Sequence, residues 1–263
     1  MKRLIFFGAG NISQAVISGL INSGYSKKDI FYIDRNQANS LKLKKLKIKR
    51  LELSSSQPSD IFILAVKPKD AMGAYSEICA FVKKPTIIAL VAGIKSKKYL
   101  AKFSNVELMR VMPNTSSRFN KGITAIHNIS ASKTTVKKVA KLFNAVGIIL
   151  EISNESYLDD FTGLIGSGPA YFFYLLQVYE KRIMKICNGD IEKKNLIMCN
   201  LLDGVSKSIG SGETINSLID AVASKKGTTE AGIKSFKGDQ LSKSFDRGIA
   251  AAIKRSKEIS SEF

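Results

Sequence analysis

The chain has 263 residues, of which 44% are hydrophobic and 24% are charged, and this balance predicts a globular protein of one or two domains. No apolar run approaches the roughly 20 residues that are needed to span a bilayer, and the apolar stretch at the N-terminus is too short for a signal peptide. We therefore expect a cytoplasmic protein with no membrane partner.

The net charge of the chain is +19, from 41 basic and 22 acidic residues, and such a surplus can indicate nucleic-acid binding. The lysines are spread along the chain, however, and the one dense run, at residues 41–50, alternates with apolar residues. That alternation is typical of the solvated face of a helix that leads into a strand. We therefore expect a small-molecule substrate and no nucleic-acid partner, with attraction of anionic ligands as a further interpretation.

Residues 1–152 alternate short apolar runs with helical patterns. Such alternation is typical of parallel strands joined by crossover helices, and it predicts an α/β fold with a doubly wound sheet. The predicted strands are Leu4–Phe7, Ile30–Ile33, Ile48–Leu51, Ile61–Val66, Thr86–Val91, Val106–Val111, Ile123–His127 and Ile148–Glu151. The predicted helices are Asn11–Asn22, Gln37–Leu46, Ala71–Val82, Lys97–Phe103 and Ser132–Phe143.

Residues 153–263 contain only helical patterns, so we predict a second, all-helical domain there. A Gly-Pro pair at 168–169 fits a helix start. The helices near Tyr171–Tyr179 and Asn195–Leu202 have more apolar surface than one face can bury, which predicts dimerisation through this domain. The predicted helices are Leu158–Ile165, Pro169–Cys187, Asp190–Ile209, Ile215–Val222, Thr229–Phe236 and Ser244–Ile259.

The first predicted strand runs straight into a glycine pair, Gly8 and Gly10. Gly8 permits a tight turn, Gly10 lets a pyrophosphate approach the main chain, and the free N–H groups of the helix that begins at Asn11 and Ile12 face the anion. The third glycine of the usual pattern is replaced by Ser13, which is small enough to serve in its place. This turn predicts a dinucleotide site, with a plain strand–helix turn as the alternative.

The second predicted strand is followed by Asp34 and Arg35. An acid at this position usually accepts hydrogen bonds from the adenosine ribose and favours NAD, whereas an arginine can pair with a 2′-phosphate and favours NADP. The two cues conflict, so the cofactor stays open between NAD (NADH) and NADP (NADPH). A strand-end turn with exposed charges is the alternative interpretation.

Three further strand ends carry small or chain-breaking residues, at Ala65–Pro68, at Ala92 with Gly93, and at Asn114. Because ligands of such sheets lie beyond the carboxyl ends of the strands, these residues predict a wall of the cofactor crevice. The one histidine, His127, is expected to be structural. The cysteines show no metal-ligand spacing, so we expect no metal site.

The helical domain contains a second predicted anion site. Gly227, Thr228 and Thr229 stand at the start of a predicted helix, shortly after Ser224. Free N–H groups and hydroxyls at a helix N-terminus can bind a carboxylate. Simple capping of the helix is the alternative.

Taken together, these segments resemble the pyrroline-5-carboxylate reductase family. The resemblance implies an N-terminal Rossmann-type domain, a helical domain that dimerises and often builds larger rings, and hydride transfer from NAD(P)H to the C=N bond of Δ1-pyrroline-5-carboxylate. The product is L-proline, in the last step of proline biosynthesis. The segments that carry the resemblance are Gly8–Asn11, Ala65–Pro68, Met112–Thr115, Thr162–Tyr171 and Gly227–Gly232, with Gly166–Tyr171 the most specific.

The resemblance also implies roles for single residues. It places Thr229 as the catalytic hydrogen-bond donor near the ring nitrogen of the substrate, and Glu155 where the family often has an acid near the active site. The nicotinamide side of the cofactor is then lined by Ala65, Val66 and Lys67, with Pro68 next to them. The substrate carboxylate is held by Ser224, Gly227, Thr228 and Thr229.

The chain departs from the family pattern at the second anion site, where Ser224-Lys225-Lys226-Gly227 replaces Ser-Pro-Gly-Gly. Gln177 and Ile165 replace a common glutamate and a common serine. Two alternatives stay open, the first of them suggested by Lys225 and Lys226. One is a divergent imine reductase on the same scaffold, and the other is a non-catalytic dinucleotide-binding regulator.

Overall fold

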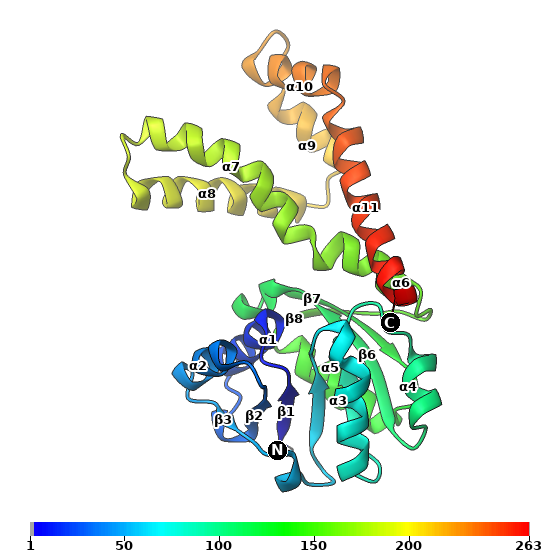
Figure 1. The fold of residues 1–263 in the computed structure, drawn as a ribbon. Coiled ribbons are helices and arrows are strands. Elements are labelled where there is room, and N and C mark those ends of the chain that lie inside the picture. The colour runs from blue at the N-terminus through cyan, green and yellow to red at the C-terminus, as the bar shows by residue number, and fades with distance from the viewer. Residues whose placement is uncertain (1–2, 263) are drawn as a thin grey trace. The chain divides into compact units, whose positions relative to one another are not determined.

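The computed structural model in Figure 1 describes residues 3–262. The chain forms two compact units, the first made of residues up to 169 and from 250 onward, and the second of residues 170–249. The first unit contains a sheet with helices, and the second contains helices only. The last strand ends at Glu151, and the functional division at residue 152 stays a prediction.

The described part of the first unit contains an eight-stranded sheet in the order β3-β2-β1-β4-β5-β6-β7-β8. The order reverses next to β1, and sheets of this kind bind their ligands at such a switch point, beyond the carboxyl ends of the strands. The predicted α/β doubly wound sheet is therefore confirmed. The strands are β1 (Leu4–Phe7), β2 (Ile30–Ile33), β3 (Lys49–Arg50), β4 (Ile61–Leu64), β5 (Thr86–Ala89), β6 (Glu107–Pro113), β7 (Gly122–Asn128) and β8 (Gly147–Glu151).

One strand pair differs from the prediction of parallel strands. β7 is antiparallel to β6, with Met112 opposite Ala125, whereas β8 is again parallel to β7. The chain between β6 and β7 holds only the short helix η3 (Thr115–Phe119). A parallel pair needs a crossover of a dozen or more residues, and this connection is too short to supply one.

Helices cover both faces of the sheet (Figure 1). β1 is buried on both sides, because Leu4 and Phe6 pack into one apolar cluster while Ile5 and Phe7 pack into the other. The first cluster holds side chains of α1 (Asn11–Asn22), α2 (Gln37–Lys45) and α5 (Lys133–Asn144), and the second holds side chains of α3 (Pro68–Phe81) and α4 (Ser96–Lys102). The short helices η1 (Lys27–Asp29) and η2 (Leu53–Ser55) lie in connections.

The first unit is completed by two pieces of chain that meet after β8. The predicted helix 158–165 is in fact α6 (Tyr157–Phe161) followed by a π-helical turn, η4 (Thr162–Gly166). The last turns of α11 (Leu241–Glu262) return to this segment. Ser256 Oγ donates to Asp159 Oδ1 over 2.8 Å, and Lys257 Nζ pairs with Asp160 Oδ1 at 2.9 Å.

The second unit contains most of α7 (Gly168–Ile186), then α8 (Ile191–Ile209), α9 (Ile215–Val222), α10 (Thr228–Gly238) and the first half of α11. Among residues 170–249, all of which the structure describes, only Ile183, Cys187 and Lys194 are buried. Many large apolar side chains of α7, α8 and α9 are exposed instead. Within residues 3–262, no helix has the length and apolar character to cross a membrane.

The close approach of α1 to η3 gives the first prediction. A Cβ at Gly19 would overlap the carbonyl oxygen of Ser117, so Gly19→Ala should lower the free energy of unfolding by about 2 kcal/mol. The control is Gly73→Ala in α3, where a Cβ would meet nothing within 4 Å, and this change should stabilise the protein by roughly 0.5–1 kcal/mol. Urea unfolding measures both. Equal stability of the two variants would contradict the prediction.

Candidate functional site

The glycine turn after β1 lies where two strands of the sheet end. Gly8 has a φ of +101°, which is unfavourable for residues with a side chain, and its N–H donates to the carbonyl oxygen of Ile33 over 2.8 Å. A Cβ on Gly8 would lie only 2.6 Å from the carbonyl oxygen of Ala65, whereas a Cβ on Gly10 would meet nothing within 4 Å. Gly8 is thus required by the fold, and Gly10 leaves open space above the turn.

The helix start that follows this turn can accept an anion. Gly10 is the N-cap of α1 and provides no side-chain hydrogen bond, and the first turn holds no acid. Ser13 is buried, and its hydroxyl donates to the carbonyl oxygen of Gly8 over 2.6 Å. The Gln14 amide donates to the carbonyl oxygen of Ala9 over 2.7 Å. Hydrogen bonds from Ser13 and Gln14 therefore hold the turn, and the N–H groups at the start of α1 can accept an anion.

The two charged residues after β2 make different contacts. The Asp34 carboxylate accepts hydrogen bonds from Ala9 N and Asn36 N, each over 2.7 Å, and from Asn39 Nδ2 over 3.2 Å. The exposed Arg35 guanidinium forms an ion pair with Glu77 Oε1 on α3 at 2.8 Å. Asp34 thus links the glycine turn to the start of α2, and Arg35 remains at the surface.

The segment after β4 lies directly beside the glycine turn. Ala65 donates its N–H to the carbonyl oxygen of Phe7 over 2.8 Å, and Ala65 and Val66 are half-buried. The exposed Lys67 is the N-cap of α3, with Pro68 as the first helical residue. The structure therefore brings Ala65 and Gly8 together at the edge where the crevice is expected.

The remaining predicted strand-end residues pack against other parts of the first unit. Gly93 is buried with a φ of +79°, and a Cβ there would lie 2.5 Å from Ile259 Cγ2 of α11. Asn114 is buried as well. Its Oδ1 accepts from Ile123 N over 3.1 Å, and its Nδ2 donates to the carbonyl oxygen of Ile165 over 3.4 Å. Ala92 is half-buried next to Gly93.

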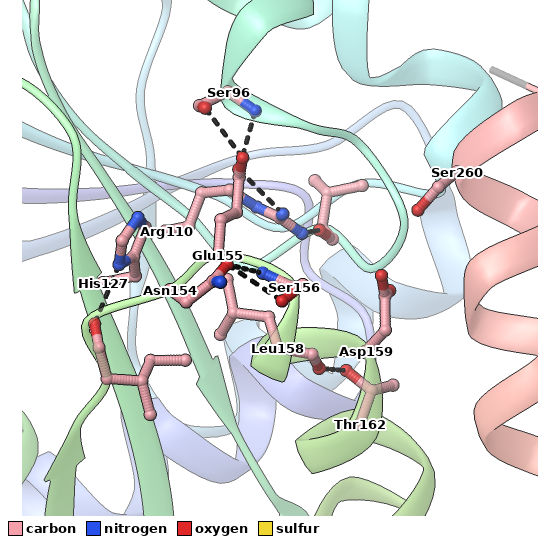
Figure 2. Close-up of polar contacts among 12 residues, drawn as sticks. Ser96, Arg110, His127, Asn154, Glu155, Ser156, Leu158, Asp159, Thr162 and Ser260 are labelled. Atoms are coloured by element: carbon pink, nitrogen blue, oxygen red, sulfur yellow. Dashed lines mark hydrogen bonds and ion pairs between the residues drawn. The ribbon is translucent and has the colours of Figure 1, made fainter.

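Figure 2 shows Glu155 at the centre of a polar cluster. Its Oε1 pairs with Nη1 of the buried Arg110 at 2.9 Å and accepts from Ser96 N over 2.7 Å. Its Oε2 accepts from the Ser96 hydroxyl over 2.9 Å. Burial would raise the pKa of Glu155, but the hydrogen bonds from Ser96 and Arg110 outweigh it and hold that pKa below its usual value. The cluster joins β6 to the start of α4.

His127 lies near this cluster, on β7 opposite Arg110. Its Nδ1 donates to the carbonyl oxygen of Ile152 over 2.8 Å, between β7 and the segment after β8 (Figure 2). Within residues 3–262, no group of three or more histidine, cysteine, aspartate or glutamate side chains is arranged to hold a metal ion.

The predicted carboxylate site lies at the start of α10 in the second unit. Gly227 is the N-cap and makes no side-chain hydrogen bond, Thr228 is exposed and Thr229 is half-buried. Lys226 has a left-handed backbone with a φ of +59°, and its N–H donates to Glu230 Oε2 over 2.5 Å. Such a backbone favours glycine, the residue that the resemblance implies at this position, and lysine costs about 1 kcal/mol there.

Several of these contacts were absent from the sequence-based prediction. They join residues that lie far apart in the chain. Examples are the contacts of Glu155 with Ser96 and Arg110, the hydrogen bond between Asp34 and Ala9, and the ion pair of Arg35 with Glu77. The sequence did contain one indication of the Arg110–Glu155 pair. An arginine between the buried apolar residues of a strand requires an acid to compensate its charge.

Comparison with known proteins identifies the family. Residues 155–259 match a family model described as pyrroline-5-carboxylate reductase dimerisation, and residues 3–93 match one described as NADP oxidoreductase, coenzyme F420-dependent. Pyrroline-5-carboxylate reductase 2 of Bacillus subtilis is 31% identical over 275 residues, which cover 100% of this chain and 97% of the relative. The chain belongs to the pyrroline-5-carboxylate reductase family. The resemblance found in the sequence is thereby confirmed.

Other members of the pyrroline-5-carboxylate reductase family agree along the whole length. The Haemophilus influenzae pyrroline-5-carboxylate reductase is 28% identical over 269 residues, covering 100% of this chain and 99% of the relative. The crystal structure of Plasmodium falciparum pyrroline carboxylate reductase with NADP bound superposes with a TM-score of 0.86, at 24% identity and 98% coverage of both chains. This likeness confirms the predicted fold, with its helical C-terminal region.

The Glu155 cluster gives a prediction for the pH dependence of stability. A carboxylate whose pKa is lowered by folding contributes stability above its unfolded pKa, and this contribution is lost as the pH falls through the folded pKa. Glu155→Gln should cost about 2–3 kcal/mol at pH 7, since it leaves buried Arg110 without its counter-charge. The difference from the wild type should shrink below about pH 4.5.

Urea unfolding at pH 7 and at about pH 4 measures this difference. Glu151→Gln, at an exposed position of β8, is the control, because it removes the same charge outside the cluster. A difference between wild type and Glu155→Gln that stays constant on acidification would contradict the assigned ion pair.

Proposed function

We propose that the protein reduces Δ1-pyrroline-5-carboxylate to L-proline with NADPH or NADH as the hydride donor, as the last step of proline biosynthesis in the cytoplasm. The observation that carries this proposal is the relation to pyrroline-5-carboxylate reductase 2 of Bacillus subtilis, which extends over both units of the chain. The glycine turn that Gly8 and Gly10 form supports it independently.

The proposed reaction requires little acid–base catalysis by the protein. The carbon of the substrate C=N bond is already electrophilic, and the cofactor supplies the hydride when it is bound. The contribution of the chain is to orient the two reactants. In the first unit, the N-terminus of α1 binds the pyrophosphate, and Ala65, Val66 and Lys67 border the nicotinamide.

The substrate-binding residues proposed here lie in the second unit. Backbone N–H groups at the start of α10, together with the hydroxyls of Ser224, Thr228 and Thr229, bind the substrate carboxylate. The absence of a side-chain cap at Gly227 supports this assignment, since the N–H groups of the first turn then need another acceptor. Thr229 donates a hydrogen bond near the ring nitrogen.

Glu155 belongs to the proposed site, but its proposed role is to position other residues. Its two oxygens already accept hydrogen bonds from Ser96 and Arg110. This arrangement supports a role in holding the β5–α4 connection, which carries Ala92 and Gly93, rather than in direct contact with the substrate.

The proposed assembly is a homodimer formed through the helical region. Large apolar side chains of α8, such as Leu196, Leu201 and Val205, are exposed, and residues 155–259 match a family model for dimerisation. Apolar faces of this extent are normally covered in a stable protein. A ring of such dimers is a further step of the same proposal.

The charged loop before α10 favours one alternative. Lys225 and Lys226 stand beside the proposed carboxylate site, and both are exposed. Their charge suits a divergent imine reductase whose substrate carries additional negative charge. A dinucleotide-binding regulator without catalytic activity would bind NAD(P)H and leave it unoxidised in the presence of any imine.

An assay of nicotinamide oxidation tests the proposed reaction. The purified protein should oxidise NADPH or NADH when pyrroline-5-carboxylate is added, and proline should accumulate in equal amount. Thr229→Ala should lower kcat by about 100-fold, because a positioned proton donor near the reacting nitrogen is lost. Thr229→Ser keeps the hydroxyl and should restore most of the activity. Absence of oxidation with either cofactor would refute the proposed function.

The proposed dimer is tested by sedimentation. The wild type should sediment as a dimer or a multiple of it, and the double variant Leu196→Asp/Val205→Asp should dissociate, because two charges are then placed on the apolar surface of α8. Leu41→Asp, which adds a charge at an exposed leucine of α2 in the first unit, should leave the assembly unchanged. A monomeric wild type at micromolar concentration would refute the interface.

A further inference from the structure

The β5–α4 connection, residues 90–95, lies beside the segment that borders the proposed nicotinamide position. Its first residue, Leu90, donates its N–H to the carbonyl oxygen of Leu64 over 2.8 Å, at the carboxyl end of the neighbouring strand β4. Ala65 follows Leu64, and Ala92 comes two residues after Leu90. Because ligands of such sheets lie beyond the carboxyl ends of the strands, the path of this connection affects how a bound dinucleotide is oriented.

Arg110 of β6 holds the start of this connection. Its side chain is only 4% exposed, and its Nη2 donates a long hydrogen bond of 3.4 Å to the carbonyl oxygen of Val91. Its Nη1 pairs with Glu155 Oε1 at 2.9 Å. The donors of a guanidinium lie in one rigid plane, so this single side chain fixes the two acceptors relative to each other.

Glu155 holds the end of the connection. Its Oε1 accepts from Ser96 N over 2.7 Å and its Oε2 accepts from the Ser96 hydroxyl over 2.9 Å, at the first residue of α4. The other end of α4 is fixed separately, because the Tyr75 hydroxyl of α3 donates to the carbonyl oxygen of Phe103 over 2.7 Å. The pair of Arg110 with Glu155 therefore fixes both ends of the connection.

We propose that Arg110 is a positioning residue for the proposed reaction, because it fixes both ends of the β5–α4 connection and thereby the place of Ala92 at the cofactor. The guanidinium is buried and binds Val91 and Glu155, so it acts through the connection and touches neither reactant. The inference rests on the proposed function in that it takes the crevice to bind a nicotinamide dinucleotide. It goes beyond that function by giving a buried ion pair a part in the rate of hydride transfer.

Arg110→Lys separates the positioning role of Arg110 from its charge. Lysine keeps the positive charge opposite Glu155 but lacks the planar fork, so it cannot bind both acceptors in the same geometry. The turnover number kcat should fall by about 10- to 100-fold, since misplacement of a reactant by about 1 Å can cost about 100-fold. The dissociation constants of NADPH and NADH should change by less than about threefold, because the N-terminus of α1 is untouched.

Arg3→Lys is the matched control. Arg3 also pairs with a buried acid through two nitrogens, with Nε 2.9 Å from Asp60 Oδ1 and Nη2 2.7 Å from Asp60 Oδ2. It precedes β1, at the amino ends of the strands and therefore at the edge of the sheet opposite the crevice. The change should lower the free energy of unfolding, as Arg110→Lys does, because both variants lose a two-point contact. It should leave kcat unchanged.

Hydrogen exchange of the free, full-length protein tests how firmly the connection is held, without any substrate. Peptides that cover residues 90–96 should exchange faster in Arg110→Lys than in the wild type, and at the wild-type rate in Arg3→Lys. NADPH should slow the exchange of the same peptides in the wild type, because the connection borders the bound dinucleotide. Circular dichroism and urea unfolding establish that each variant is folded, and the oxidation assay supplies kcat.

A double variant tests whether Arg110 and Glu155 act through the same connection. Arg110→Lys/Glu155→Gln should turn over no more slowly than the slower of the two single variants, because the second change releases a connection that is already free. Losses of kcat that multiply would mean that the two residues act separately, which contradicts the inference.

The outcomes separate this inference from the function on which it rests. Absence of dinucleotide oxidation by the folded wild type overturns both. A kcat of Arg110→Lys equal to that of the wild type, or an equal loss of kcat in Arg3→Lys, overturns the inference alone. Unchanged exchange at residues 90–96 in Arg110→Lys also overturns it, because Arg110 would then not hold the connection.

Discussion

The contact between Gly8 and Ala65 sets the geometry of the turn on which the proposed cofactor site depends. The main chain after β1 passes so close to the main chain after β4 that no side chain fits between them. This close approach requires glycine at position 8, and the left-handed turn there leads directly into the uncapped N-terminus of α1. Ser13 and Gln14 then hold the turn by hydrogen bonds from within the helix. The conformation of the turn is thus held by contacts within the chain itself.

A second part of the first unit is organised by buried charge. Arg110 is buried in β6 between the apolar residues Met109 and Val111, and the Glu155 carboxylate compensates its charge. Because Glu155 also binds Ser96, the pair connects β6, the start of α4 and the segment after β8. Such a pair adds little net stability compared with apolar packing, but removal of one partner is costly. Its value here is that three connections are held in one arrangement.

Much of the fold could be predicted from local sequence, but the direction of one strand and one helical turn could not. The helices Asn11–Asn22 and Ile215–Val222 were predicted with their observed bounds, because apolar spacing and polar flanking residues mark both ends. The predicted parallel direction of β7 was wrong, although the connection after Pro113 is too short for the crossover that a parallel strand needs. The π-helical turn at Thr162 was missed, since its apolar spacing does not differ from that of an α-helix.

The site was harder to predict than the fold. Residue types at strand ends suggested Asp34, Arg35 and Glu155, but their partners lie 25, 42 and 45 residues away in the chain. Such pairings arise only when the sheet has folded, and no local sequence pattern predicts them. The left-handed Lys226 is a further example, because sequence alone marks a left-handed position only where glycine or asparagine stands there.

The packing of α11 on Gly93 has a consequence for how the chain folds during synthesis. The first unit is made of two pieces of chain, and the whole second unit is inserted between them. Until Ile259 has left the ribosome, the connection after β5 lacks the side chain that covers Gly93. The packing of α11 on Gly93 is therefore completed only after the residues of the second unit have been synthesised.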